Sequence, residues 1–305
     1  MKKEIQTPAY QNLYNDYDKY IVARDYKLGG GKMYQTAVKE FLIWMEQTGI
    51  TNIRDVTTKE MMQYYDYLIV RPNQKKAGTL ASTTIKLHLL AIYIFMDNLL
   101  SLKEITKGWL IPKYSGEDQK PRNVLTVEEV KSLYQHSENH LEKALLAIAY
   151  GCGLRRSEIH KLNSNDVLLS TGMLIVRQGK GFKRREVPMS DNVLEDLKKY
   201  VTEYRHETVK ERQNITAFFI DKKAKRMSGD TMNKTLKKII TRTQNQAILD
   251  KEITLHCLRH SIANHLAEKN AGLDFIRGFL GHSFINTAYI YAAKNKKRTK
   301  AITII

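Results

Sequence analysis

The sequence predicts a mainly α-helical protein of two domains, with a small antiparallel β-sheet in the second domain. The first observation is the length of 305 residues, which suits two domains that can each bury a core. The second is the spacing of the apolar residues, which follows a helical period over most of the chain. The third is a pair of short β-type runs on either side of Gly179-Lys180-Gly181, the pattern of a β-hairpin.

Residues 1–112 are expected to form an all-helical domain whose helices are joined by short polar loops. Thr57 and Glu60 form a capping-box signature before the third helix, and Ser82 is expected to cap the fourth. Lys32 follows three glycines, but no hydroxyl residue follows it as in a phosphate loop, so a turn is expected there. The expected helices span residues 10–26, 34–47, 58–70 and 82–100.

A polar segment bounded by prolines, residues 113–122, is expected to link this domain to a second one, residues 123–305. Thr126 and Glu129 form another capping box at the start of the second domain. The second domain is expected to be mostly helix with a small antiparallel sheet. Its clearest elements are two strands over residues 173–177 and 182–188, followed by helices over residues 191–204 and 230–242.

Composition narrows the class of protein. A 42% hydrophobic and 27% charged chain is typical of a folded protein, and two cysteines are too few for a disulfide scaffold or a cysteine-ligated zinc site. No apolar run is long enough for a membrane span and no secretory signal is visible, so we expect a soluble cytoplasmic protein. The net charge of +18, most of it in residues 113–305, indicates a polyanionic partner. Charge alone does not separate DNA from RNA, an anionic membrane, or a basic surface that only maintains solubility.

Five polar side chains that together suit one reaction are scattered through the second domain. Arg155 lies in a Gly-Leu-Arg-Arg-Ser-Glu run, and His256 and Arg259 lie three residues apart, on one face of an expected helix. His282 follows a glycine, and Tyr291 comes nine residues later. Taken singly, each has an ordinary structural interpretation, and no motif indicates a metal site.

Together these residues resemble the tyrosine recombinase family, also called phage integrases, over roughly residues 125–293. The resemblance places the first catalytic arginine at Arg155 and not at Arg156, and the hairpin lysine at Lys180. It matches residues 1–112 to the family's core-binding domain on length and helix count only. It implies a tetramer on two double-stranded DNA sites, with neither metal nor cofactor. The remaining matches are His256, Arg259, His282 and the nucleophile Tyr291, with Glu158 supporting the base.

The chemistry of each side chain suits its implied role. Two arginine forks, Arg155 and Arg259, can bind the non-bridging oxygens of a phosphate whose charge grows in the transition state. The tyrosine hydroxyl needs a general base, for which His256 is the candidate, and the departing 5′-oxygen needs an acid, for which Lys180 is the candidate. His282 would donate a hydrogen bond to a phosphate oxygen. By the resemblance, Tyr291 would form a 3′-phosphotyrosine bond.

A rival nucleophile and rival functions remain open. Tyr289 and Tyr291 would face different sides of a helix, so only one can attack, and the family spacing selects Tyr291. A type IB topoisomerase shares the chemistry, and a regulator could keep the fold without cutting. The apolar end of the chain, residues 302–305, is expected to dock on an adjacent subunit, with docking on its own domain as the alternative. The basic residues near the hairpin that are expected to contact DNA phosphates are Arg177, Lys183, Arg184 and Arg185.

Overall fold

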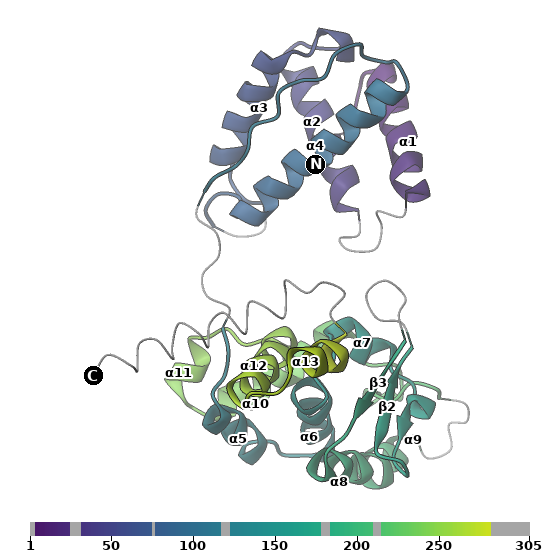
Figure 1. Ribbon diagram of the computed structural model, residues 1–305, viewed down its shortest axis with the longest axis vertical. Helices are drawn as coiled ribbons and strands as arrows, with labels where there is room; N and C mark the ends of the chain where they lie inside the picture. Colours follow the sequence, from purple (N-terminus) through teal and green to yellow (C-terminus); the bar gives the residue numbers. More distant parts are fainter. Residues whose placement is uncertain are drawn as a thin grey trace. The chain divides into compact units, whose positions relative to one another are not determined.

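The computed structural model describes residues 4–24, 32–74, 77–116, 123–177, 184–209 and 215–281. The chain divides into two compact units, which we call unit 1 (Met1–Lys120) and unit 2 (Pro121–Ile305). Each has its own hydrophobic core, and each is described by itself. The elements are mostly helices, with one small sheet in unit 2, as expected (Figure 1).

Unit 1 is helical in its described part. A single 3₁₀ turn (Ile53–Asp55) precedes the third helix, where the expected capping box of Thr57 and Glu60 is present. The expected cap at Ser82 is wrong, because Ser82 is already the first helical residue and Ala81 precedes it with no side-chain cap. The helices are α1 (Pro8–Ala23), α2 (Met33–Gln47), α3 (Thr58–Val70) and α4 (Ser82–Ser101).

The core of unit 1 is rich in aromatic rings. The rings of Phe41 and Tyr64 meet edge to face with centroids 5.0 Å apart, and Trp109 lies 6.0 Å from Phe41. Among the described residues, α4 is the one helix long and apolar enough to cross a membrane, but it packs as a core helix with Ile92 and Phe95 fully buried. Several tyrosines of this unit, among them Tyr10, Tyr17 and Tyr64, are therefore core residues.

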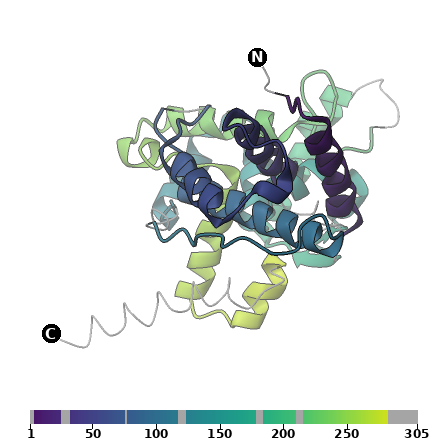
Figure 2. The ribbon, with the colours of Figure 1, turned by 90° about the horizontal axis from the view of Figure 1, so that it is seen from above.

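Unit 2 begins with the second expected capping box, in which Thr126 accepts from the Glu129 N–H at 3.2 Å. Unit 2 combines its helices with a short sheet (Figure 1), and α12 (Leu255–Glu268) packs against α13 (Leu273–Leu280) (Figure 2). The helix α6 (His140–Leu146) continues as a π turn (Ala147–Gly151), which leads through Gly153 to α7 (Arg156–Lys161). The helices are α5 (Val127–Gln135), α6 (His140–Leu146), α7 (Arg156–Lys161), α8 (Asp191–Lys199), α9 (His206–Val209), α10 (Gly229–Arg242), α11 (Gln246–Leu249), α12 (Leu255–Glu268) and α13 (Leu273–Leu280).

The sheet has the antiparallel order β1 (Val167–Leu168), β2 (Met173–Val176), β3 (Arg185–Pro188). Leu174 pairs with Val187, and both are fully buried, so one face of the sheet packs on the core. The sequence did not indicate β1, which has only two residues. The expected strand over 173–177 ends one residue early, and the turn expected at Gly179-Lys180-Gly181 lies outside the described residues.

Several expected helices differ at their ends: α1 spans Pro8–Ala23 where a helix over residues 10–26 was expected, and two helices of unit 2 also differ. The helix expected over residues 191–204 is α-helical only to Lys199 and continues as a π turn (Tyr200–Arg205). The helix expected over residues 230–242 begins one residue earlier, where Ser228 accepts a hydrogen bond from the Thr231 N–H at 3.1 Å. Boundaries of this kind depend on side-chain caps and packing more than on the apolar period.

Candidate active site

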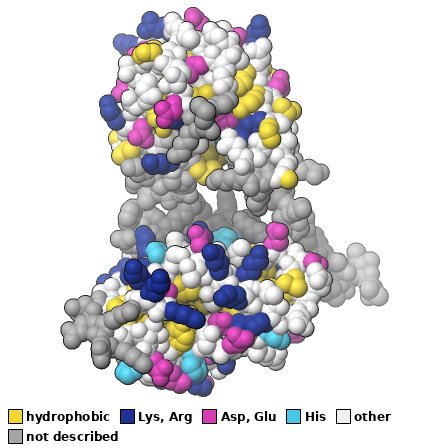
Figure 3. Space-filling model, turned by 180° about the vertical axis from the view of Figure 1, so that it is seen from behind, with side chains coloured by type: hydrophobic (Ala, Val, Ile, Leu, Met, Phe, Trp, Pro, Cys, Tyr) yellow, Lys and Arg dark blue, Asp and Glu magenta, His cyan; other side chains and the backbone are white. Residues whose placement is uncertain are grey.

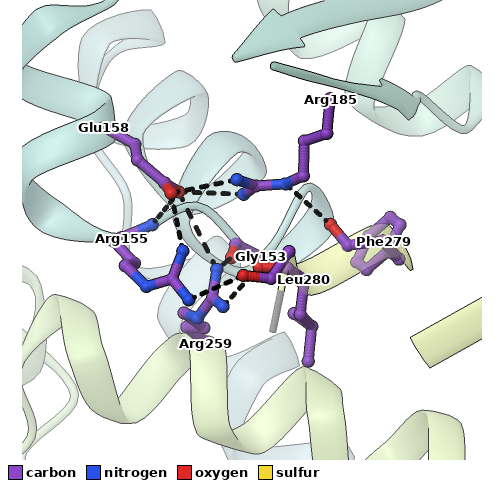
Figure 4. Close-up of polar contacts among 8 residues, drawn as sticks. Gly153, Arg155, Glu158, Arg185, Arg259, Phe279 and Leu280 are labelled. Atoms are coloured by element: carbon purple, nitrogen blue, oxygen red, sulfur yellow. Dashed lines mark hydrogen bonds and ion pairs between the residues drawn. The ribbon is translucent and has the colours of Figure 1, made fainter. Parts of the chain in front are cut away.

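A single buried carboxylate, Glu158 on α7, organises the polar cluster of unit 2 (Figure 4). Its Oε1 accepts hydrogen bonds from Nη1 of Arg155 at 2.7 Å and from Nη1 of Arg185 at 2.9 Å. Its Oε2 accepts from the Arg155 backbone N–H at 2.9 Å and from Nη2 of Arg185 at 2.8 Å. Nη1 of Arg259 lies 3.8 Å from the same oxygen. Three guanidinium groups therefore surround one carboxylate and leave the cluster with a positive charge.

The acidity of Glu158 follows from these contacts. Burial alone would raise the pKa of the Glu158 carboxyl, but the hydrogen bonds and charge of Arg185, together with Arg155, outweigh it. The net effect lowers the pKa from its ordinary value of 4.5 to about 2. Glu158 is thus a fixed negative charge at neutral pH. It accepts hydrogen bonds from Arg155 and Arg185, and the support of the histidine base that the resemblance implies stays a prediction.

Arg155 and Arg259, the two arginines expected to bind phosphate, are brought together from positions more than a hundred residues apart. Arg155 is the residue that precedes α7, where the backbone turns from extended to helical. Arg259 lies in α12, is 2% exposed, and donates from Nη1 to the Gly153 carbonyl at 2.6 Å. Gly153 has φ +62°, and a Cβ there would lie 2.7 Å from Leu280 Cδ2, so the close approach requires glycine.

The same three arginines bind the carbonyls at the C-terminal end of α13. Such carbonyls have no partner within the helix and carry the negative end of its dipole, so cations stabilise them. The residue that follows the helix is Gly281, which is left-handed at φ +62° and directly precedes His282 in the sequence. The pairs are Arg185 Nε with Phe279 O at 3.2 Å, Arg155 Nη2 with Gly281 O at 3.0 Å, and Arg259 Nη2 with Leu280 O.

His256 lies one turn before Arg259 in α12 but is exposed, whereas Arg259 is buried. Its ring packs edge to face against His260, with centroids 4.4 Å apart, and His260 is 6% exposed. An exposed imidazole beside a buried arginine can reach a ligand that lies over the helix. His260 was not among the predicted site residues, although its spacing of four residues from His256 indicates contact on a helix.

Four of the predicted site residues, Lys180, Lys183, His282 and Tyr291, lie outside the described residues. The three arginines expected to contact DNA differ in exposure. The side chains of Arg177 and Arg184 are 60% and 64% exposed and pair with Asp166 and Glu186 respectively. Arg185 is 10% exposed and is bound by Glu158, which the sequence did not indicate.

Lysine and arginine side chains gather on the face of unit 2 that Figure 3 shows (dark blue), in keeping with the charge excess of residues 113–305. A basic surface of this kind suits a polyanion. Within the part of the chain that the structure describes, no group of three or more His, Cys, Asp or Glu side chains could hold a metal ion.

Comparisons with known proteins agree with this chemistry. Residues 123–298 match the model of the phage integrase family. Tyrosine recombinase XerD of Staphylococcus saprophyticus is 30% identical over 276 residues, 88% of each chain. Tyrosine recombinase XerA of Pyrococcus horikoshii is 28% identical over 86% of this chain and 90% of the relative. XerD of Oceanobacillus iheyensis is 36% identical over 188 residues, 60% of this chain and 62% of the relative.

Solved structures share the fold at low identity. The XerH site-specific recombinase bound to palindromic difH substrate has a TM-score of 0.71 and 20% identity, and covers 90% of this chain and 79% of that chain. The Tn1549 transposon integrase bound to transposon right end DNA has a TM-score of 0.70 and 16% identity, and covers 95% and 99%. The family match and the tyrosine recombinase relatives do not favour the topoisomerase or the non-cutting regulator. The chain therefore belongs to the phage integrase family, and it is a site-specific tyrosine recombinase, an enzyme that breaks and rejoins DNA strands.

Proposed function

We propose that Tyr291 is the nucleophile of this recombinase. Its hydroxyl oxygen attacks the phosphorus of a DNA phosphodiester, the bond to the 5′-oxygen breaks, and a 3′-phosphotyrosine bond forms. The 5′-oxygen leaves with a proton from Lys180, and His256 takes the proton of the phenol. A 5′-hydroxyl from a partner strand then reverses the step, so the phosphodiester energy is conserved and ATP is not needed.

The observation that carries this proposal is the convergence of Arg155 and Arg259 on Glu158. The transition state places negative charge on the non-bridging phosphate oxygens, and preorganised cations stabilise it most when they need not reorient. Both guanidinium groups are fixed by backbone carbonyls as well as by the carboxylate. His282, which follows the fixed Gly281, completes the set as a hydrogen-bond donor to the phosphate.

The exposed basic residues near the hairpin support DNA binding around this site. Arg177 and Arg184 have exposed side chains and would neutralise backbone phosphates together with Lys183. A solved lambda integrase structure contains a dimer bound to a core site, and the XerH and Tn1549 structures contain DNA. By analogy, we assign this chain a cytoplasmic tetramer on two DNA sites. The reaction would serve integration, excision, inversion or dimer resolution.

Recombination of paired sites tests the function. Footprinting on neighbouring genomic DNA first defines a site, and two differently labelled copies are then incubated with the protein. Recombinant products and four-way junctions are expected. Relaxation of supercoils that needs no second site would instead indicate a topoisomerase, and binding without cleavage would indicate a regulator; either result overturns the proposal.

Arg155 has a matched control in its neighbour. Arg155→Lys removes the fork that binds Glu158 and the phosphate, so we expect cleavage to fall about 100-fold or more. Arg156 is 51% exposed and pairs with Asp230 at 2.9 Å, so Arg156→Lys should cleave as the wild type does. Equal losses in the two variants would remove the catalytic assignment of Arg155.

A further inference from the structure

The side chain of Arg185 is largely buried, unlike that of its neighbour Arg184. Arg185 begins β3, where it shares a face with the fully buried Val187, whereas Arg184 before it is 64% exposed. Its guanidinium makes two parallel hydrogen bonds to the Glu158 carboxylate, at 2.9 and 2.8 Å. Its Nε, Nη1 and Nη2 all donate to oxygens of the protein, those of Glu158 and the Phe279 carbonyl, so the side chain is poorly placed to track a DNA phosphate.

The remaining contacts of Arg185 reach the end of α13. Its Nε donates to the Phe279 carbonyl at 3.2 Å. Its guanidinium also covers Gly281, where an added Cβ would lie 2.8 Å from Nη1 and 2.9 Å from Cδ. The side chain therefore connects β3, on which it lies, to two other elements: to α7 through Glu158, and to α13 through its last residues (Figure 4).

Each of these elements borders a group of the proposed reaction. β3 follows the segment that contains Lys180, α7 follows Arg155, and α13 precedes His282. We infer that Arg185 is a positioning residue of this recombinase, which fixes Glu158 and the end of α13 so that Arg155 and His282 meet the scissile phosphate. The inference rests on the proposed function. It replaces the phosphate contact that the run of basic residues suggested for Arg185.

The two roles predict opposite results for Arg185→Lys. Lysine keeps the positive charge, and at a phosphate contact it would restore most of the binding. It has no planar fork, so it cannot bind both oxygens of Glu158 and also reach the Phe279 carbonyl. A positioning role therefore predicts that the lysine variant loses cleavage while it keeps its affinity for DNA.

The experiment measures single-turnover formation of the covalent adduct on a nicked half-site, at protein concentrations that saturate the DNA. For Arg185→Lys we expect a rate about 10- to 100-fold lower, since small displacements of reacting groups have effects of this size. The half-site Kd and its salt dependence should stay within about twofold of the wild type. Wild-type cleavage in Arg185→Lys, or a parallel loss of affinity and salt dependence, would overturn the inference.

Two further variants separate positioning from stability. Arg242, the last residue of α10, is the control because its guanidinium is also bound by carboxylates. Its partners are Glu138 and Glu142, and neither belongs to the proposed site. Arg242→Lys should lower the melting temperature and leave the saturated cleavage rate unchanged. In Glu158→Gln, adding Arg185→Lys should reduce the rate little further, because Arg185 acts through Glu158. If the double variant instead shows the product of the two single losses in cleavage rate, Arg185 does not act through Glu158. If the wild-type protein itself forms no covalent adduct, the proposed function is wrong.

Discussion

Replacing Glu158 by glutamine should destabilise unit 2 without affecting unit 1. The carboxyl is 3% exposed and its pKa is about 2, against an ordinary value of 4.5. A shift of this size corresponds to about 3 kcal/mol of stability at neutral pH, at about 1.4 kcal/mol per pKa unit. The amide N–H₂ of glutamine can only donate, and so can the guanidinium groups of Arg155 and Arg185, so hydrogen bonds to that nitrogen are lost. Breaking a buried pair in this way costs about 3–5 kcal/mol, so the two figures agree.

The sign of the pH dependence follows from the lowered pKa. The folded state favours the ionised carboxylate, so this stability is fully present above about pH 4.5 and is lost as the pH falls toward 2. The free energy of unfolding of the wild type should therefore fall toward that of Glu158→Gln as the pH falls from about 4.5 to 2. At pH 7 the difference should be largest, and near pH 2 it should almost vanish.

The two units can be followed separately in the full chain. Both tryptophans, Trp44 and Trp109, lie in unit 1, so tryptophan fluorescence during urea unfolding reports on that unit alone. Hydrogen exchange of peptides from α7 and α13 reports on unit 2. We expect faster exchange there in Glu158→Gln and an unchanged fluorescence transition. A difference between wild type and variant that stays constant from pH 7 to pH 3 would refute the reasoning.

Three other predictions concern the site and the end of the chain. Lys180→Ala should slow cleavage of an ordinary 5′-oxygen far more than cleavage of a 5′-bridging phosphorothiolate, whose sulfur leaves without a proton; equal losses would remove Lys180 as the acid. Gly281→Ala places a Cβ at φ +62° against Arg185 and should cut the cleavage rate, whereas Gly278→Ala, with open space around its Cβ, should be neutral or slightly stabilising. Deleting residues 302–305 should spare half-site binding but weaken cooperative assembly on gel-shift analysis, and normal assembly would count against docking on a neighbouring subunit.

Local signals in the sequence were sufficient for much of the fold. The capping boxes at Thr57 and Thr126 act within one turn of helix, so both helix starts follow from neighbouring residues. β1 was not predicted because two residues carry no alternating pattern, and its pairing with β2 exists only in the folded sheet. The π turn after Lys199 was missed because its apolar spacing continues that of a helix.

The site divides in the same way. Arg155 and Arg259 were identified by motif, but their meeting at Glu158 depends on packing between distant segments. Arg185 was grouped with the basic residues around it because adjacent basic residues look alike in a sequence. The alternation of β3 held the missing information, since it places Arg185 on the same face as Val187 and Glu186 on the other. The binding of the α13 carbonyls by arginines has no sequence signature.

The attachment point of the DNA tests the central claim most directly. A nicked substrate traps the covalent intermediate, and mass spectrometry of the digested adduct identifies the residue that carries the nucleotide. We predict that Tyr291 carries it, that Tyr291→Phe forms no adduct while binding DNA almost as the wild type does, and that Tyr289→Phe still forms it. An adduct that survives in Tyr291→Phe and disappears in Tyr289→Phe would contradict the account.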